Sequence, residues 1–267
     1  MTGSTTAPKG GRFNGLSVLV TGACGGLGRQ IVADFAAEGA ALTLADRDAG
    51  ALEALAATLR AGGARVAVSA GDITLEATAE AMVEAALAAF GALDIAVNNA
   101  GIASPFARLA ETSAETAERT MAVNLFGLFY SMKAEIRAMT NAGGRPAAIV
   151  NMASVAGLVG APQLSLYAAS KHAAIGLTRS AALEYARRGI RINAVCPSFA
   201  RTAMIDDIAA RPGDAAPIGE GDLTRGIPMR RLATPAEVSI AVLFAADPAN
   251  TFMTGQALGV DGGLTAM

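Results

Sequence analysis

Short runs of aliphatic residues alternate with alanine-rich segments of helical periodicity along this 267-residue chain, and this alternation limits its fold more than any other feature. The pattern predicts strands near residues 17–21, 41–45, 65–69, 94–97, 147–151, 190–195 and 256–260, with helices between them. Successive parallel strands need right-handed crossover connections, which are usually helices. We therefore expect an α/β fold: a doubly wound, Rossmann-type parallel sheet with helices on both faces. Ligands bind such sheets at the carboxyl ends of the strands.

The composition is that of a chain with one large core, because 52% of its residues are hydrophobic and only 16% are charged. We expect a single domain over residues 15–267, preceded by a flexible arm at residues 1–14 that lacks the apolar segment of a secretory signal. The stretch 211–222 is rich in Pro, Gly and Asp, and we expect residues 202–228 to form a substrate lid.

Several classes of function lack a basis in the sequence. The formal net charge of −2 offers no basic face for nucleic acid. The longest uncharged run, residues 146–170, exceeds membrane-spanning length, but prolines and glycines interrupt it, so we expect no bilayer helix. Cys24 and Cys196 are isolated and His172 is the only histidine, so the sequence predicts neither a disulfide framework nor a metal site. We expect a reducing cytoplasmic location.

A glycine-rich turn follows the first predicted strand, in the stretch Thr21-Gly-Ala-Cys-Gly-Gly-Leu-Gly28, and leads into a helix at about residues 27–38. Gly22 permits a tight turn, and Gly26 lets the backbone approach a pyrophosphate. Gly28 allows the helix, which begins near Leu27, to pack on the sheet. Free N–H groups at the helix start attract anions. Strand, turn and helix in this order predict a dinucleotide site.

An acidic residue, Asp46, ends the second predicted strand, at the distance from the turn where a carboxylate accepts hydrogen bonds from the adenosine ribose. Asp48 better fits an N-cap of the next helix. Arg47 is ambiguous, since it could stack on adenine or contact a 2′-phosphate. Because the glycine turn carries no Lys or Arg and Asp46 would repel a 2′-phosphate, we expect NAD to be preferred over NADP.

The pair Tyr167 and Lys171 lies in a predicted helix over residues 166–188, where a spacing of four places both side chains on one face. A nearby ammonium favours the phenolate, so we expect Lys171 to lower the pKa of Tyr167 and make it a proton-transfer group. Taken alone, the pair is equally well explained by packing and a snorkelling lysine.

Further signatures follow in a fixed order: Thr21-Gly22-xxx-Gly26-x-Gly28, Asp72-Ile73, Asn98-Asn99-Ala100-Gly101, Asn124, Ser154, Tyr167-xxx-Lys171 and Pro197 to Thr202. With this set, the chain strongly resembles the short-chain dehydrogenase/reductase family in its single-domain form, over about residues 15–265. Two departures are the pair Ala153-Ser154, where the family commonly has Ser-Ser, and Pro197-Ser198, where it commonly has Pro-Gly.

The resemblance implies roles for these residues. Tyr167 would be the catalytic acid and base, Lys171 would keep the phenol acidic and hold the nicotinamide ribose, and Ser154 would bind the substrate oxygen. Asn124 would position a water relay behind Lys171. The remaining cofactor contacts that the resemblance implies are Asp72 and Ile73 at adenine, Asn99, Ala100 and Gly101 beside the cofactor, and Pro197, Phe199 and Thr202 at the nicotinamide.

The predicted function is NAD(H)-dependent interconversion of an apolar secondary alcohol and its ketone. Ser154, Gln163 and Tyr167 would contact the substrate, within a wall formed by Ala103, Ser104, Leu158, Gln163, Leu164, Phe199, Met204 and Ile208. Two alternatives stay open: a non-catalytic dinucleotide sensor, and a reductase of a charged hydroxy or keto acid that uses Arg108, Arg201 or Arg211.

A homotetramer is expected as well. The two long predicted helices, residues 111–138 and 166–188, and the apolar segment 252–260 offer more nonpolar surface than one sheet covers.

Overall fold

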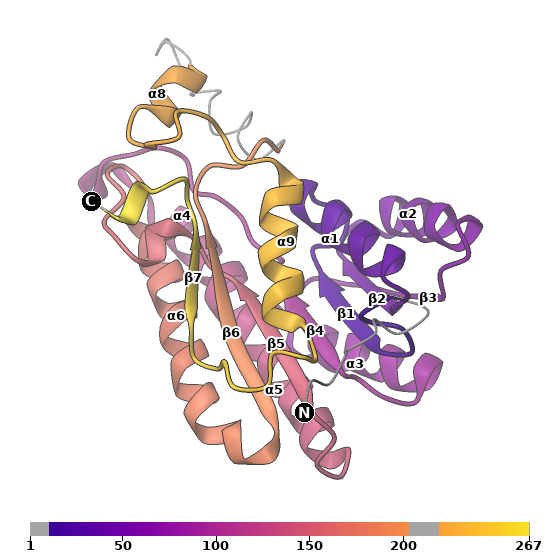
Figure 1. The fold of residues 1–267 in the computed structure, drawn as a ribbon. Helices are drawn as coiled ribbons and strands as arrows, with labels where there is room; N and C mark the ends of the chain where they lie inside the picture. The colour runs from indigo at the N-terminus through magenta and orange to yellow at the C-terminus, as the bar shows by residue number, and fades with distance from the viewer. Residues whose placement is uncertain (1–10, 203–218, 267) are drawn as a thin grey trace, which may run out of the picture.

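A single parallel sheet organises the protein, as the sequence predicts (Figure 1). The computed structural model describes residues 11–202 and 219–266. Within them the sheet contains β1 (Ser17–Thr21), β2 (Ala41–Asp46), β3 (Val66–Ala70), β4 (Ile95–Asn98), β5 (Ala147–Met152), β6 (Ile190–Pro197) and β7 (Ala257–Val260). The strand order is β3-β2-β1-β4-β5-β6-β7, and all neighbouring pairs are parallel. The order reverses between β1 and β4, where doubly wound sheets bind ligands.

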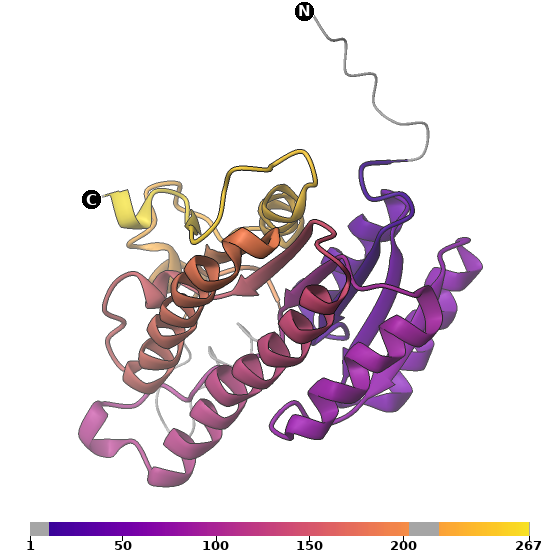
Figure 2. The same ribbon diagram turned by 90° about the horizontal axis from the view of Figure 1, so that it is seen from below.

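Helices cover both faces of the sheet (Figure 2). One face carries α1 (Gly26–Ala37), α2 (Ala49–Ala61) and α9 (Pro235–Ala246), and the other carries α3 (Glu76–Phe90), α5 (Leu128–Asn141) and α6 (Ser165–Tyr185). Two shorter helices, α4 (Ala114–Met121) and α8 (Glu220–Thr224), complete the set in the described part. Short 3-10 turns are at Leu109–Glu111, Val155–Gly157, Ala186–Arg188 and Leu264–Ala266.

Two apolar cores lie on the opposite faces of the sheet, because successive strand residues point to opposite sides. On β1, Val18 and Val20 enter the core beneath α1 and α9, whereas Leu19 enters the core beneath α3, α5 and α6. On β4, Ile95 likewise joins the first core and Ala96 the second. The aliphatic runs of the inner strands are therefore buried on both faces, which is typical of parallel sheets, whereas the edge strands β3 and β7 are half-buried.

The sequence predicts one helix over residues 111–138, but the structure divides this stretch into separate elements. Ser113 caps α4, its hydroxyl accepting a hydrogen bond from Thr116 N–H at 3.1 Å, so this helix begins at Ala114. Between α4 and α5 the chain then makes a π-helical turn, η2 (Ala122–Gly127). Such turns insert an extra residue and are frequent at functional sites. The turn contains Asn124, whose side-chain amide forms two hydrogen bonds with the backbone of Ile102.

Parts of the predictions fall on residues outside the described part of the chain. These are residues 1–10 of the expected arm, residues 203–218 of the expected lid, and with them Met204, Ile208 and Arg211.

Candidate active site

The glycine turn is fixed against the segment that follows β4. Gly22 has a φ of +63°, and a Cβ there would lie 2.9 Å from the Ala100 backbone, so both the conformation and the close approach require glycine. Asn99 Nδ2 donates to the carbonyls of Thr21 and Gly22, at 3.1 and 2.9 Å. The Ala100 N–H donates to Thr21 Oγ1 at 3.0 Å. The turn is thus held in one shape by neighbours far away in the sequence.

Two glycines at the start of α1 lie close to neighbouring segments. A Cβ on Gly28 would collide with the Gly22 carbonyl oxygen, and one on Gly26 would meet the side chain of Thr202 at 2.8 Å. Leu27 is half-buried against the first core. The N-cap residue Gly25 supplies no side-chain acceptor, so the first N–H groups of α1 keep the capacity to bind an anion.

Asp46 is the last residue of β2, and Asp48 follows it as the N-cap that the sequence predicts. Asp48 caps α2, with its Oδ1 accepting from Ala51 N–H at 2.9 Å. Asp46 is half-buried at the strand end, where Oδ2 accepts from Cys24 N–H of the glycine turn at 2.9 Å and Oδ1 accepts from Arg47 N–H at 2.8 Å. These bonds orient the Asp46 carboxylate beside the turn. The Arg47 side chain is exposed.

Asp72 and Ile73 follow β3 at the same end of the sheet. Asp72 is exposed and accepts from Thr74 N–H at 2.9 Å. Ile73 packs against η2, where a Cβ on Gly127 would lie 3.0 Å from its side chain. The structure therefore places this pair beside α5, and no hydrogen bond joins it to the glycine turn.

Lys171, Asn124 and Gly101 meet at one point. A Cβ on Gly101 would lie 3.3 Å from Asn124 Oδ1 and 3.5 Å from Lys171 Nζ. Asn124 is buried and holds both backbone groups of Ile102, accepting from its N–H at 2.8 Å and donating to its carbonyl at 2.9 Å. It also donates to Ser170 Oγ at 3.1 Å. The loop after β4 is thereby fastened to η2 and α6.

The Lys171 ammonium forms its hydrogen bond with a backbone carbonyl. Lys171 Nζ lies 5.7 Å from the centroid of the Tyr167 ring and donates to the Met152 carbonyl at 2.8 Å. Ser154, just after β5, accepts from Ala156 N–H at 3.2 Å through its hydroxyl. That hydroxyl also donates to the Pro197 carbonyl at 3.5 Å, and it lies near enough to the Tyr167 phenol to affect the pKa of the phenol. Met152 and Ser170 could not be predicted from the sequence, because a backbone carbonyl and an ordinary helix serine carry no signal of their own.

The pKa of Tyr167 differs from the sequence expectation. Burial raises it above its usual value, and the hydrogen bond with Ser154 opposes this only in part. Burial also lowers the pKa of Lys171 to about 8. The expected lowering of the phenol pKa by Lys171 is therefore not seen in this structure, since the ammonium is directed to Met152 and the desolvation of the phenol outweighs it.

The remaining predicted positions surround this group from two loops. Gln163, just before α6, has a positive φ of 65° without being glycine, and its carbonyl accepts from Ala107 N–H at 3.0 Å. Such strained backbone often marks functional sites. Pro197 is buried at the end of β6, and Phe199 and Thr202 are half-buried beyond it. Ser198 has no positive φ, so the common glycine is not required at this position.

The expected substrate wall is mostly apolar where the structure describes it. Leu164 and Ser104 are buried, and Ala103, Leu158 and Phe199 are half-buried. Two of the arginines named for an acidic substrate are exposed. Arg108 begins the turn at Leu109–Glu111, and Arg201 pairs with Glu220 at 2.8 Å.

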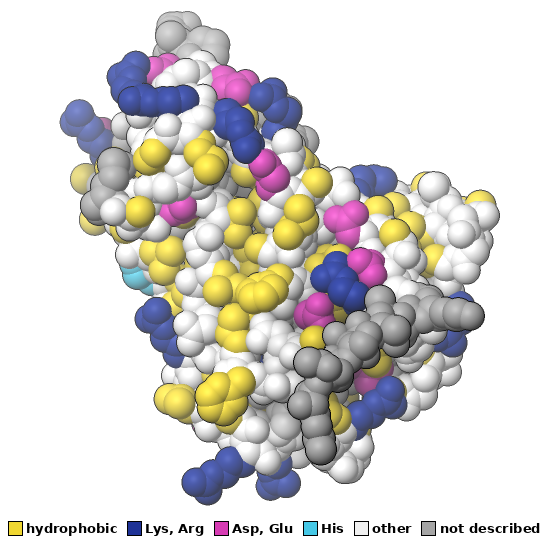
Figure 3. All heavy atoms as spheres, viewed as in Figure 1, with side chains coloured by type: hydrophobic (Ala, Val, Ile, Leu, Met, Phe, Trp, Pro, Cys, Tyr) yellow, Lys and Arg dark blue, Asp and Glu magenta, His cyan; other side chains and the backbone are white. Residues whose placement is uncertain are grey.

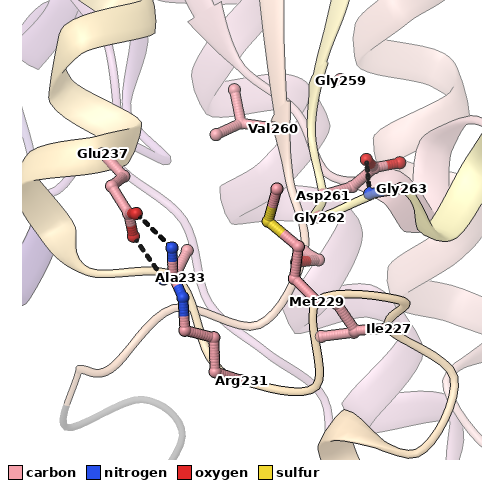
Figure 4. A pocket seen from close by; sticks show the side chains of 11 residues that line it. Ile227, Met229, Arg231, Ala233, Glu237, Gly259, Val260, Asp261, Gly262 and Gly263 are labelled. Carbon is pink, nitrogen blue, oxygen red and sulfur yellow. Dashed lines mark hydrogen bonds and ion pairs between the residues drawn. The ribbon is translucent and has the colours of Figure 1, made fainter.

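A separate hollow of about 310 Å³ lies beside β7 (Figure 4). Its charged lining is self-paired, because Arg231 Nη2 lies 2.6 Å from Glu237 Oε1 and Asp261 accepts from Gly263 N–H at 2.9 Å. Its lining residues are Ser198, Ile227, Met229, Arg231, Ala233, Glu237 and residues 259–263. None of the predicted catalytic residues lines this hollow.

Two other kinds of feature are absent from the part of the chain that the structure describes. No cluster of His, Cys, Asp and Glu there could hold a metal ion. Over residues 11–202 and 219–266, no helix combines the length and hydropathy needed to cross a membrane.

Known proteins are similar to this protein over nearly the whole of its chain. A family model described as enoyl-(acyl carrier protein) reductase matches residues 22–265. The 2,5-dichloro-2,5-cyclohexadiene-1,4-diol dehydrogenase of Sphingobium indicum is 41% identical, with 96% of this chain and 99% of the relative covered. Cyclohexanol dehydrogenase of an Acinetobacter species is 37% identical, with 96% and 97% covered. The crystal structure of levodione reductase superposes with a TM-score of 0.89 at 34% identity, covering 95% of this chain and 99% of that one.

Proposed function

Because this chain belongs to the short-chain dehydrogenase/reductase family of oxidoreductases, we propose that it interconverts an apolar secondary alcohol and its ketone with NAD(H), using Tyr167 as acid and base. One observation carries the proposal. Lys171 and Asn124 converge on Gly101 beside the glycine turn, while Ser154 interacts with Tyr167 on the same helix as Lys171.

The residues present fit a dinucleotide cofactor. A Cβ at Gly22 would strike the segment that supports the turn, and α1 begins without a side-chain cap. We propose that the N–H groups there bind the pyrophosphate, together with Gly22, Gly26 and Leu27. The other proposed cofactor contacts are Asp46, Arg47, Asp72, Ile73, Asn99, Ala100, Gly101, Tyr167, Lys171, Pro197, Phe199 and Thr202. When bound, the nicotinamide supplies the two-electron step by exchanging a hydride with the carbinol carbon.

In the proposed mechanism the chain's own residues handle the proton. For reduction, the Tyr167 phenol donates its proton to the substrate oxygen, while Ser154 hydrogen bonds that oxygen as negative charge develops. For oxidation, the phenolate takes the hydroxyl proton. The raised pKa of Tyr167 supports the first direction at neutral pH, because it keeps the phenol protonated. Lys171 and Asn124 keep their proposed roles in holding the nicotinamide ribose and in relaying protons.

The preference for NAD rests on Asp46. Its carboxylate is fixed by the N–H groups of Cys24 and Arg47, so it cannot swing away without breaking both hydrogen bonds. A 2′-phosphate carries nearly two negative charges. At the short range of a ribose contact we expect repulsion by Asp46 to outweigh attraction by the exposed Arg47.

An apolar substrate is supported by the half-buried wall and by the relatives named for cyclic alcohols. A carboxylate substrate would need a free cation near the reacting carbon. Arg201 is already paired with Glu220, and Arg108 lies exposed. We propose that Gln163 contributes to substrate contact through its constrained loop.

A homotetramer is also proposed. Hydrophobic side chains gather over α9 and β7 on the face seen in Figure 3, and Ile240 and Phe244 on α9 are 68% and 53% exposed. Leu183 at the end of α6 is 84% exposed. Apolar groups of this kind on neighbouring elements are typical of subunit interfaces. The single domain over residues 15–267, the lid at 202–228 and the reducing cytoplasmic location remain predictions beside it.

A panel of neutral secondary alcohols and ketones, assayed by absorbance of the reduced nicotinamide, tests the proposed function. We expect turnover with NAD(H), and we expect Tyr167→Phe to abolish it almost completely while cofactor affinity is retained, because only the proton-carrying hydroxyl is lost. Lys171→Ala should lower both turnover and cofactor affinity. Binding of NADH without consumption of any ketone would instead indicate a dinucleotide sensor, and unchanged activity of Tyr167→Phe would contradict the mechanism.

A further inference from the structure

A buried carboxyl, Glu135, belongs to a polar chain that the proposed reaction does not use. Glu135 lies on α5 and is 0% exposed. Asn98 Nδ2 donates to Glu135 Oε2 and to Asn151 Oδ1, both at 3.0 Å. Asn151 Nδ2 in turn donates to Thr178 Oγ1 at 2.8 Å. These hydrogen bonds therefore join four elements, α5, β4, β5 and α6.

The direction of each of these hydrogen bonds follows from the Thr178 hydroxyl. The Thr178 hydroxyl donates its only hydrogen to the Ala174 carbonyl at 2.8 Å, so its oxygen must accept from Asn151. Asn151 then presents its oxygen to Asn98, and Asn98 uses both Nδ2 hydrogens. Asn98 Oδ1 is left as an acceptor, and so is Glu135 Oε1. Neither oxygen has a partner among the described residues.

The surroundings do not favour a charged Glu135. Burial raises its pKa to about 7, and the hydrogen bond from Asn98 opposes this only in part. The cations on the elements packed around it are engaged elsewhere. Lys133 and Arg137 of α5 pair with Glu76 and Glu80 of α3, Lys171 of α6 donates to Met152, and Arg191 of β6 donates to Ala245. The other titratable side chains of α3, α5 and α6 are exposed or half-buried: Glu84, Tyr130, Tyr167, His172, Arg179, Glu184 and Tyr185.

We propose that Glu135 is a positioning residue that keeps a proton and donates it to Asn98 Oδ1, so that the carboxyl and the amide form a double hydrogen bond. A neutral carboxylic acid supplies the one donor that the two unpartnered oxygens lack. The inference rests on the proposed function, because it concerns the same site.

The double hydrogen bond acts on the site through two strand ends. Asn98 and Asn151 are directly paired across β4 and β5. The residue after Asn98 is Asn99, which holds the glycine turn, and the residue after Asn151 is Met152, which accepts from Lys171. A shift of either strand end would therefore move the cofactor turn relative to Lys171.

Stability measurements test whether Glu135 keeps its proton, and they need no substrate. The unfolded carboxyl loses its proton near its usual pKa of about 4.3, whereas the folded one keeps it up to about pH 7. The stabilisation by the protonated acid is thus complete below about pH 4.3, decreases as the pH rises from there, and is lost above about pH 7. Relative to Glu135→Gln, which carries a permanent neutral donor, the wild-type Tm should fall by roughly 5 °C or more between about pH 5 and pH 8. An NMR titration of the Glu135 side-chain carboxyl should give a midpoint near neutral pH.

Kinetics test the positioning role, at a temperature well below the Tm of every variant. At about pH 6 we expect Glu135→Gln to keep kcat/KM within about threefold and Glu135→Leu to lose about tenfold or more, chiefly through the KM for NAD. Glu84→Leu, at an exposed site on α3, is the matched control and should change neither kcat/KM nor the KM for NAD.

Three results would overturn the inference: parallel Tm curves for wild type and Glu135→Gln, a carboxyl that titrates near its usual value, or equal losses for the Gln and Leu variants. If the wild type turned over no alcohol, the proposed function would fail, and the Tm curves and the titration would still decide whether Glu135 keeps its proton.

Discussion

At the scale of single residues, the protonation state of Tyr167 sets the pH dependence of the reaction. Because burial raises the pKa of this phenol, the protonated form dominates at neutral pH. We expect the rate of ketone reduction to hold through neutral pH and fall in alkaline solution, and the rate of alcohol oxidation to rise with pH. Initial rates in both directions, over a pH series with saturating cofactor, check this. An oxidation rate independent of pH would contradict a phenol that must first lose its proton.

The fixed carboxylate of Asp46 gives a second prediction at this scale. Asp46→Asn removes the charge but keeps an oxygen that can accept from Cys24 N–H, so the turn should keep its shape. We expect the ratio of kcat/KM for NADP to that for NAD to rise by about tenfold, or roughly 1.4 kcal/mol. A wild-type enzyme that already used NADP more efficiently would show that Asp46 does not face the ribose.

The chemistry of the site was easier to predict than its electrostatics. The spacing of Tyr167 and Lys171 placed both on α6, as expected. The partner of the ammonium could not be predicted, because it is the carbonyl of Met152 and any residue there would offer the same group. The desolvation that raises the pKa of the phenol depends on tertiary packing around Tyr167, which a local sequence pattern does not contain.

At the scale of elements, Asp48 provides a counterpart to Asp46. Its carboxylate caps α2 by accepting from Ala51 N–H. We expect Asp48→Ala to lower the free energy of unfolding by about 1 kcal/mol, since an unpartnered N–H remains at the helix start. The preference between NAD and NADP should not change. Urea unfolding monitored by circular dichroism, with cofactor kinetics on the same preparations, measures both effects. A large shift in cofactor preference would mean that the two carboxylates have the opposite roles.

The inner strands β1, β2, β4, β5 and β6 were predictable to within a few residues because each buries two faces, and a doubly buried strand needs an aliphatic run. The edge strands β3 and β7 are only half-buried, and their β-branched residues still predict them. The helix expected at residues 111–138 was not predicted correctly. Its beginning depends on the Ser113 cap, and η2 interrupts it. The π-helical turn follows from the contact of Asn124 with the backbone of Ile102, and such a contact between distant segments leaves no periodic trace in the sequence.

At the scale of the whole molecule, the exposed apolar side chains of α9 predict association. We expect light scattering at micromolar concentration to give the mass of four 26.7 kDa chains. Replacing Ile240 and Phe244 together by Asp should reduce this mass, because buried charges would face each other across the interface. Leu87→Asp, at a partly exposed site on α3, is the control and should leave the mass unchanged. A monomeric wild type would contradict the prediction.

The strand order has a consequence for how the chain folds as it leaves the ribosome. Only β4 must find a place beside a strand made much earlier, because it pairs with β1. From then on each new strand adds to the free edge left by the one before it, β5 to β4, β6 to β5 and β7 to β6. The first half of the sheet can thus close during synthesis and act as a template for the second. We expect the slow step in refolding the complete chain to be the long-range pairing of β1 with β4, because this pair has the largest loop-closure cost of the strand pairs in the described sheet.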